Sequence, residues 1–368
     1  MKLRMLLLGL CFIVTNAWTQ TTVPFDTTYW MFAGKIAHET YRGQACIELT
    51  QGNVYLKDST FKNGIIEFDM ALLPHRYFPG FGFRVQDQNN LELVYLRPHQ
   101  LGNPDAIQYT PVFKGEGAWQ LYYGDGYSTA VTYPLEEWVH VKLIVQDSKA
   151  EVYLAEATKP DFIIHALKHQ GRAGRISLTN EATTSVRFAN FRYTPMDPAP
   201  LIGPFKPQAS PIPGTVLAWQ ISNPFAEKQL HNRYDLPFEL TRRLSWQTLL
   251  GEPSGLINVS RLHPLDSLAN TVFAKVTLIA DQAQIKKFQF GFSDRVKVYL
   301  NGQLVYGGQD VFLSRDYRFL GTIGYFDELY LRLKKGTNEL WLAISEDFGG
   351  WGLKGLIPDR TGLKVKRE

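Results

Sequence analysis

Apolar and polar residues alternate with a period of two along most of this 368-residue chain. In residues 64–70, for example, three apolar side chains fall on one face, and Glu67 and Asp69 fall on the other. Such alternation is the pattern of a β-strand with one buried face. Turn-forming residues separate the alternating runs, and no long run has the period of a helix. The sequence therefore predicts an all-β protein made of antiparallel β-sandwiches of the jelly-roll type.

The turn residues between the alternating runs indicate where individual strands begin and end. The strongest short signal is Asn301-Gly302 between two such runs, because a type I′ hairpin turn needs positive φ at both central residues. A second hairpin is expected across the polar turn 87–90. The expected strands are residues 64–70, 81–86, 91–97, 138–145, 151–154, 174–178 and 186–193 in the first half and 270–279, 287–292, 295–300, 303–306, 329–333 and 339–344 in the second.

A proline-rich segment divides the alternating runs into two blocks. Seven prolines lie between residues 195 and 213, and proline favours extended chain without a donor for a sheet. The length of the chain also suits two domains better than one. The predicted organisation is a jelly-roll domain over 21–194, a linker over 195–213, a second sandwich domain over 214–361 and a basic tail over 362–368.

The first twenty residues have the features of a signal peptide. Lys2 and Arg4 precede a run of apolar residues at 5–14, and small residues follow, which places cleavage within 17–21. This run is too short to cross the roughly 30 Å of a bilayer core as a helix, so no permanent membrane span is expected. Cys46 is then the only cysteine of the mature chain, and no internal disulfide can form. Export without disulfides favours a secreted, periplasmic or cell-surface protein of a bacterium.

The charges of the chain argue against nucleic acid as a partner. The net charge is +4, and Lys and Arg are interspersed with Asp and Glu without a basic stripe. Histidines are scattered as well; His165 and His169 have helical spacing in a strand-rich region, so no metal site is predicted. No cofactor is expected, and no motif supplies the clustered oxygens that a structural calcium ion would need.

Two stretches of sequence resemble known families. The segments 61–69, 82–85, 137–142 and 186–192 are similar to the concanavalin A-like lectin/glucanase jelly rolls, in particular to the laminin-G-like and keto-disaccharide-hydrolase-like branches. Residues 271–354, through 292–302 and 333–340, look like the galactose-binding-like sandwich. The first resemblance implies a jelly roll that binds or cleaves carbohydrate. The second implies an accessory sugar-binding module.

The lectin/glucanase resemblance raises Glu67 and Asp69 as a catalytic pair. Retaining glucanases of this fold place paired carboxylates on one strand, and alternation puts these two on one face. The glucanase pattern requires a further acidic residue shortly after the Asp, whereas Met70-Ala71-Leu72 follows here. We therefore interpret both as solvated carboxylates of the strand face and assign no catalytic residue.

Ligand-binding candidates come from the polar faces of the predicted strands and from aromatic loops. If the apolar residues of 81–97 face the core, the intervening polar and aromatic side chains face outward, as sugar binding requires. The alternative is an ordinary polar outer face. The loop around Tyr123 either binds ligand or tucks under the sheet, and a Gly-rich turn near Trp351 is open to the same two interpretations. The predicted ligand-binding residues are Arg84, Gln86, Tyr95, Arg97, His99, Gln108, Trp119, Tyr123, Tyr127 and Trp351.

The function predicted from the sequence is that of an exported, non-catalytic carbohydrate-binding or surface-interaction protein. Its partner is an oligo- or polysaccharide, held by aromatic, Arg and Gln side chains on a concave sheet face. The alternative is an enzyme that cleaves glycosidic bonds, with the first domain catalytic and the second accessory. A scaffold that binds no sugar is the third interpretation.

Overall fold

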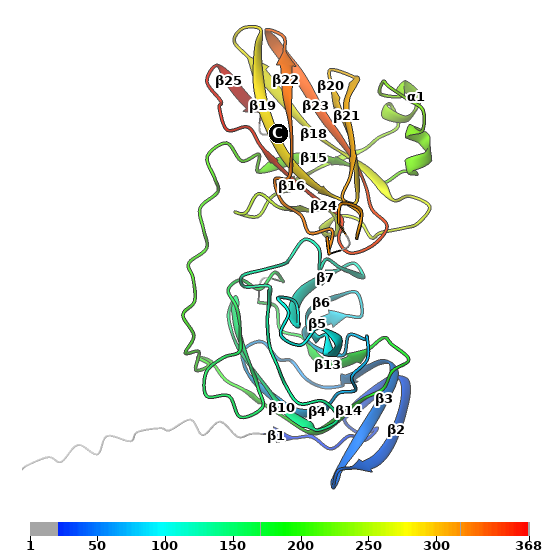
Figure 1. Ribbon diagram of the computed structural model, residues 1–368, viewed down its shortest axis with the longest axis vertical. Coiled ribbons are helices and arrows are strands. Elements are labelled where there is room, and N and C mark those ends of the chain that lie inside the picture. The colour runs from blue at the N-terminus through cyan, green and yellow to red at the C-terminus, as the bar shows by residue number, and fades with distance from the viewer. Residues whose placement is uncertain (1–20, 170, 317, 367–368) are drawn as a thin grey trace, which may run out of the picture.

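The structure is a computed structural model that describes residues 21–366 except 170 and 317. The predicted signal peptide lies outside the described residues. Strands dominate, and the only α-helix of the described part is the four-residue α1 (Phe238–Thr241), beside the short 3-10 turns η1 (Pro98–Gln100), η2 (Glu227–Leu230) and η3 (Val259–Arg261). Nowhere in this part of the chain is a helix both long and apolar enough to cross a bilayer. The prediction of two antiparallel β-sandwiches in tandem is confirmed (Figure 1).

The first sandwich is one continuous sheet that curls around a single core. Its central strand order is β12-β11-β10-β4-β14-β3-β13-β5-β6-β7-β8. The predicted inward residues Ile66, Phe68 and Met70 are completely buried in this core. The strands are β1 (Thr21–Thr22), β2 (Trp30–Tyr41), β3 (Gln44–Leu56), β4 (Gly64–Ala71), β5 (Gly80–Asp87), β6 (Asn90–Leu96), β7 (Ile107–Phe113), β8 (Glu116–Gly117), β9 (Ser128–Thr129), β10 (Trp138–Gln146), β11 (Lys149–Leu154), β12 (Phe162–Ile164), β13 (Arg175–Asn180) and β14 (Val186–Pro195).

The second sandwich consists of two sheets. The strand orders are β16-β15-β18-β23-β20-β21, with β25 also paired to β18, and β17-β24-β19-β22. All the described pairings are antiparallel, as the sequence predicts. The strands are β15 (Ala218–Ser222), β16 (Trp246–Leu250), β17 (Ile257–Asn258), β18 (Thr271–Ala280), β19 (Gln284–Ser293), β20 (Arg295–Leu300), β21 (Gln303–Gln309), β22 (Asp327–Leu333), β23 (Gly336–Ser345), β24 (Gly352–Leu356) and β25 (Leu363–Lys366).

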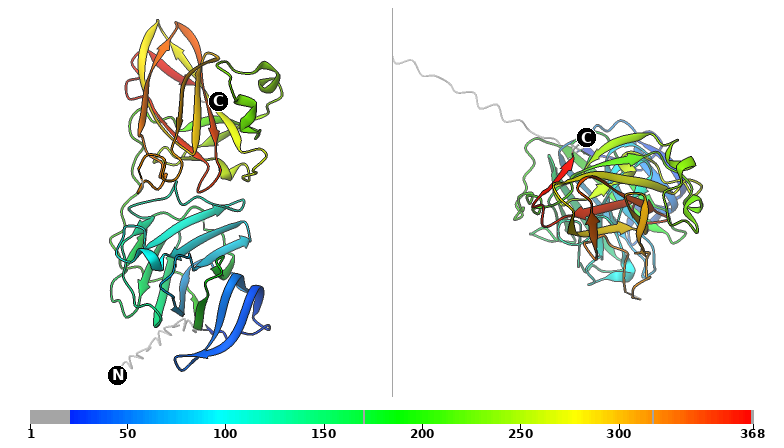
Figure 2. Two further views of the ribbon diagram at one scale, coloured as in Figure 1. Left: turned by 45° about the vertical axis from the view of Figure 1, so that its right-hand side comes forward. Right: turned by 90° about the horizontal axis from the view of Figure 1, so that it is seen from above.

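Two hairpin turns show how local sequence sets the strand register. Asn301 and Gly302 have φ of 51° and 87°, and they join β20 to β21 in the predicted hairpin. Arg42 and Gly43 have φ of 44° and 80° and join β2 to β3 in a long hairpin that alternation did not predict. This hairpin projects from the first sandwich, at the end away from the second one (Figure 2).

The first part of the proline-rich segment is fixed to the first sandwich. The buried carboxylate of Glu151 accepts hydrogen bonds from the backbone N–H groups of Ile202 and Gly203, and Lys206 forms an ion pair of 2.6 Å with Asp125. Residues 207–213 are exposed throughout. Only these residues therefore form a free connection, which runs along the outside of the molecule to the second sandwich (Figure 1).

Trp351 lies in the core of the second sandwich. Its side chain is completely buried, and the indole Nε1 donates to the backbone carbonyl of Ile344 at 3.0 Å. Of the two interpretations of this Gly-rich turn, the structure favours packing within the domain, and the prediction of Trp351 as a ligand-binding residue is wrong. The turn brings the indole inward, because the two sheets leave a space there that only a large apolar side chain fills, and the exposed ring of the turn is Phe348 instead.

We expect the substitution Trp351→Ala to destabilise the second sandwich by about 3–5 kcal/mol, because it leaves a large cavity and removes the hydrogen bond of the indole. Urea unfolding followed by tryptophan fluorescence and circular dichroism measures the change. The control is Tyr330→Ala, which removes a ring that is 64% exposed on β22 and should change stability by less than about 0.5 kcal/mol. Equal, small effects of both substitutions would contradict the assignment of Trp351 to the core.

Candidate functional site

Three of the predicted ligand-binding residues meet around the guanidinium group of Arg97. Tyr95 in β6 lies opposite Gln108 in β7, and Arg97 follows Tyr95 by two residues. Nη2 of Arg97 donates to the Tyr95 hydroxyl at 2.7 Å and to Oε1 of Gln108 at 2.6 Å, while Nη1 donates to the backbone carbonyl of Asp105 at 2.6 Å. All three side chains are buried, so the expectation of an open polar face is wrong here. They form a support for the loop above them.

That loop joins β8 to β9 and displays Trp119. Nε2 of Gln108 donates to the backbone carbonyls of Trp119 and Tyr122, at 2.8 and 2.5 Å. The Trp119 ring lies 6.0 Å from the guanidinium carbon of Arg97. Gln108 thus holds the backbone of the loop at Trp119 and at Tyr122.

Aromatic rings from both sandwiches form a strip at the surface around Trp119. Phe312 and Phe348 of the second sandwich lie 6.2 and 5.9 Å from Trp119, and Phe78 lies on the other side of Arg97, 5.8 Å from its guanidinium carbon. Phe78 is 43% exposed and Phe348 is 64% exposed. We define the aromatic strip as Phe78, His99, Trp119, Phe312 and Phe348.

His99 closes one end of the strip. Its ring packs edge-on against Phe78 at 5.6 Å, and burial, together with the charges of Arg76 and Arg97, lowers its pKa. The imidazole is therefore neutral near pH 7 and contributes an apolar edge rather than a charge.

Gln120 joins the Trp119 loop to the second sandwich. Its backbone N–H donates to Gly349 and its backbone carbonyl accepts from Ile323, at 2.9 and 3.0 Å. Its side-chain Nε2 donates to the carbonyl of Leu320 at 2.9 Å, and its Oε1 accepts from the hydroxyl of Ser293 at 3.2 Å. The side chain is almost completely buried, so the loop is held equally firmly by both sandwiches.

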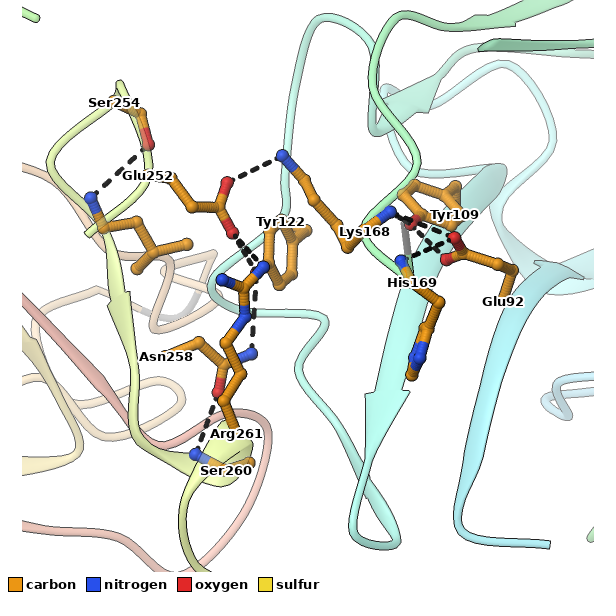
Figure 3. A network of polar contacts seen from close by, with 11 residues as sticks. Glu92, Tyr109, Tyr122, Lys168, His169, Glu252, Ser254, Asn258, Ser260 and Arg261 are labelled. Carbon is orange, nitrogen blue, oxygen red and sulfur yellow. Dashed lines mark hydrogen bonds and ion pairs between the residues drawn. The ribbon is translucent and has the colours of Figure 1, made fainter. Parts of the chain in front are cut away.

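A polar network spans the junction beside this loop (Figure 3). Glu252 of the second sandwich accepts a hydrogen bond from the Tyr122 hydroxyl at 2.5 Å and forms an ion pair with Lys168 at 2.6 Å. Arg261 approaches the same carboxylate at 3.4 Å. Lys168 and Glu252 are both more than nine-tenths buried in their side chains, so water does not compete for this pair.

The tyrosine-rich loop tucks under the sheet rather than standing free. Tyr122 is completely buried, and Tyr127 stacks on Tyr109 at 6.4 Å and lies 5.3 Å from Tyr122. The Lys168 ammonium group lies 5.2 Å from the Tyr127 ring centre. Tyr123 is half-buried. Of the two interpretations of this loop, the structure favours the one in which the loop packs against the core. Tyr127 lies at the junction between the sandwiches and is not part of the aromatic strip.

Arg84 does not face solvent as alternation predicts. It is completely buried and donates to the carbonyls of Lys62 and Asp147 and to Oδ1 of Asn63, at 2.9, 2.6 and 3.1 Å. The cause is an irregularity in the pairing of β5 with β6 after Phe83, where Arg84 adopts a φ of 51° and turns inward. Gln86 is exposed, and its Nε2 donates to the backbone carbonyls of Arg84 and Ala173 at 3.2 and 2.8 Å, so it contacts no member of the aromatic strip.

Glu67 and Asp69 lie on the outer face of β4, where they flank His140. The imidazole lies 2.8 Å from Asp69 and 3.4 Å from Glu67, and Arg192 lies 3.1 Å from Glu67. Hydrogen bonds from His140 and Arg192 lower the pKa of Glu67 to about 2, and the two carboxylates raise the pKa of His140 to about 9. Glu67 therefore carries no proton for a leaving group at neutral pH.

Three carboxyl groups that no sequence pattern indicated lie behind the aromatic strip. We define this carboxyl cluster as Glu116, Asp294 and Glu346. Burial and the charge of Asp294 raise the pKa of Glu116 to about 7. Burial, with Asp294 and Glu116 nearby, raises the pKa of Glu346 well above its usual range, and burial raises that of Asp294.

The carboxyl cluster is incompletely hydrogen-bonded. Gly350 N–H donates to Oε1 of Glu346 at 3.3 Å, and Asp347 N–H donates to Oδ2 of Asp294 at 3.0 Å. Oε2 of Glu346 and Oδ1 of Asp294 have no hydrogen-bond partner among the described residues. In the sequence, these acids stand at turns and strand ends like ordinary surface residues. Asp294 and Glu346 lie side by side in the second sandwich, and Glu116 reaches them from the first.

No group of three or more His, Cys, Asp or Glu side chains within residues 21–366, apart from the two undescribed positions, is arranged to hold a metal ion. The lone Cys46 is buried in β3, where burial raises the pKa of its thiol.

Comparisons with known proteins find similarity in fold only. No protein-family model and no curated protein sequence matches the chain. Solved structures that match include a carbohydrate-binding module from Bacillus subtilis (17% identity, 48% of this chain and 95% of that chain, TM-score 0.32). A second is a β-glucanase from Bacillus licheniformis (14% identity, 47% of this chain and 94% of that chain, TM-score 0.31). A third is the carbohydrate recognition domain of Emp46p (13% identity, 45% of this chain and 88% of that chain, TM-score 0.31). The predicted resemblance to lectin/glucanase jelly rolls is confirmed at the level of the fold, over about half of the chain. The galactose-binding-like resemblance stays a prediction.

The carboxyl cluster should make the junction sensitive to pH. All three groups have a higher pKa in the folded chain than when unfolded, so the folded state binds more protons above the usual pKa of about 4.5. Their stabilising contribution is complete below that pH. The contribution of Glu116 declines as the pH rises above that value and is lost above about 7, where this group ionises in the folded state. We expect the thermal midpoint to fall between pH 4.5 and 7 for this reason, and Glu116→Gln to make that fall shallower.

Differential scanning calorimetry from pH 4 to 8 measures this dependence. The matched control is Glu156→Gln, which neutralises an exposed carboxylate after β11 and should leave the slope of the wild type unchanged. An identical slope for the wild type and Glu116→Gln would show that Glu116 titrates in the folded protein as it does in water.

Proposed function

We propose that this chain is an exported, non-catalytic carbohydrate-binding protein that holds a polysaccharide on the aromatic strip. The carrying observation is the group of rings from both sandwiches, in which the exposed Phe348 lies 5.9 Å from the half-buried Trp119 and the exposed Phe78 shares the Arg97 guanidinium with it. An aromatic ring offers a flat apolar face with negative charge above it, which suits the C–H face of a sugar ring.

Rigidity also supports this function. The backbone at Trp119 is held by Gln108 and, one residue later, by the bonds of Gln120 to the second sandwich, so the loop needs little ordering when a sugar stacks on the ring. The strip is an open surface rather than an enclosed cavity, which suits a segment of a long chain better than a small free sugar. Export is part of the proposal and rests on the predicted signal peptide and the absence of a second cysteine in the mature sequence.

The alternative function is cleavage of a glycosidic bond, and Glu116 is the observation that favours it. Its pKa of about 7 leaves a substantial protonated fraction at neutral pH, as a general acid requires. Such an enzyme also needs a second carboxylate about 5–9.5 Å away that the sugar or water can reach. The neighbouring Asp294 and Glu346 are at most 2% exposed, so neither is accessible, and we favour binding without cleavage.

We expect the substitutions Trp119→Ala and Phe348→Ala each to weaken binding to the preferred polysaccharide at least about fivefold. One stacked ring contributes about 1–3 kcal/mol where bases stack on aromatic side chains, and we expect a similar contribution for sugars. Affinity electrophoresis in gels containing plant, fungal and bacterial polysaccharides, followed by calorimetry, measures this. Tyr330→Ala is the matched control, because Tyr330 is as exposed as Phe348 (64% each) but lies on β22 outside the strip.

The same polysaccharides distinguish the two functions when release of reducing ends is assayed. No release with undiminished binding supports the proposed function. Release that Glu116→Gln abolishes would establish the enzyme instead. Unchanged binding in both strip variants, or no binding of any glycan, would refute the role of the strip.

A further inference from the structure

The second sandwich contains a groove that is separate from the aromatic strip. It has a volume of about 370 Å³ and lies on the outer face of β20, β21 and β23. Residues of β20 alternate, so that Val296 and Val298 enter the core while Arg295 and Lys297 face outward. The turn η2 forms one wall through Glu227 and Leu230. A volume of this size falls within the range of about 300–1,000 Å³ for sites that bind small molecules.

The groove exists because the neighbours of Lys297 are small. Across the sheet, Lys297 lies between Ala343 of β23 and Gly307 of β21. A Cβ placed on Gly307 would meet only one atom, the carbonyl oxygen of Val296 at 3.9 Å, so the backbone does not require glycine at this position. Beyond this row, the same face is covered by the cluster around Leu230, Tyr299 and Trp341. The space above Lys297 is therefore left open where that cover ends.

The charges at the groove are unequally compensated. Arg295 donates to both oxygens of Glu227 at 3.0 and 3.2 Å through Nε and to Asp347 at 2.7 Å through Nη1. Its positive charge is thus neutralised by two carboxylates, which also raise its pKa. Lys297 instead donates to a neutral group, the backbone carbonyl of Leu230, at 2.5 Å.

An ammonium group has three donors, and Lys297 uses one of them on Leu230. No carboxylate of the described residues lies within ion-pair distance of it. The Gln309 side chain also lines the groove, next to Arg295 in the sheet. The groove thus offers one uncompensated positive charge, an amide that both donates and accepts, and an apolar floor at Ala343.

We propose that this groove binds a carboxylate-bearing sugar, a uronate residue, with its carboxylate on Lys297. The charge of Lys297 selects an anion, and the volume and the polar wall of Glu227 and Gln309 fit the ring and hydroxyl groups that a simple organic acid lacks. The choice of a sugar acid, but not the carboxylate site itself, rests on the proposed carbohydrate-binding function. The groove lies apart from the aromatic strip, so the two sites can be tested separately.

The test uses the mature chain with sodium glucuronate and a short galacturonate oligomer as probes, with glucose and acetate for comparison. Saturation-transfer NMR and calorimetry measure binding at fixed ionic strength. We expect the uronates to bind, glucose to bind at least tenfold more weakly, and Lys297→Met to reduce uronate affinity about tenfold or more, since hydrogen bonds to charged groups contribute about 1.5–3 kcal/mol.

Two further variants separate the role of the groove from that of folding. Gly307→Val fills the groove without backbone strain and should also abolish binding, while Lys297→Arg should retain it. Lys287→Met, which removes an ammonium group on β19, should bind uronates like the wild type. The thermal midpoint of each variant shows whether it folds. If Lys297→Met does not fold, Gly307→Val takes its place as the test of the groove.

Each outcome either supports or overturns the proposal. Uronate binding that both groove variants lose and Trp119→Ala keeps supports it, even if neutral polysaccharides fail to bind the strip. Equal affinity for glucose and glucuronate would overturn it, as would an absence of uronate binding or a loss caused by Trp119→Ala. Acetate binding as tight as glucuronate would refute the sugar acid as the ligand.

Discussion

The position of Trp119 depends on two glutamine side chains that act on opposite sides of one loop. Gln108 reaches up from the first sandwich and Gln120 reaches across to the second, and both are buried. A buried amide must satisfy its donors and its acceptor, so each one fixes the backbone that supplies its partners. The aromatic strip is consequently a property of the pair of sandwiches, because Phe312 and Phe348 complete it only when the second sandwich lies in this position.

The junction contains groups that are costly to bury. The attraction between Lys168 and Glu252 is strong because the surrounding medium has low polarity, but each ion has lost its hydration. Such a pair adds little net stability and mainly defines how the two sandwiches are arranged. The carboxyl cluster goes further, since Glu346 and Asp294 each leave an oxygen without a partner. Protonation lowers this cost, because a neutral carboxyl group is far less unfavourable in a protein interior than a carboxylate. These buried groups therefore lower the affinity between the sandwiches but define their relative geometry.

Much of the fold could be predicted from the sequence, because alternation and turn chemistry are local. The burial of Phe68 and the hairpin at Asn301 follow from a few neighbouring residues. Arg84 escaped prediction because a single irregularity in strand pairing reverses the side to which the following residues point. Tyr95, Arg97 and Gln108 were predicted to face outward to a ligand, yet they are buried beneath a loop that no local pattern places.

The carboxyl cluster lay beyond sequence reasoning for a different reason. Glu116 comes from the first sandwich, and Asp294 and Glu346 come from the second, so their meeting depends on how two separate folding units dock. No period or spacing within either unit carries that information. The same is true of Phe312 and Phe348, which reach the strip across more than a hundred residues of sequence from Trp119.

The short exposed stretch 207–213 has a consequence for how strongly the sandwiches must attract one another. Seven residues reach at most about 25 Å even when fully extended. A tether of this length keeps two attached bodies at an effective concentration on the order of millimolar. Two sandwiches whose mutual affinity is too weak to hold them together as separate molecules stay in contact when they are tethered in this way. Residues at the contact therefore need not provide high affinity between the sandwiches, and substitutions there can serve recognition of a ligand at the surface.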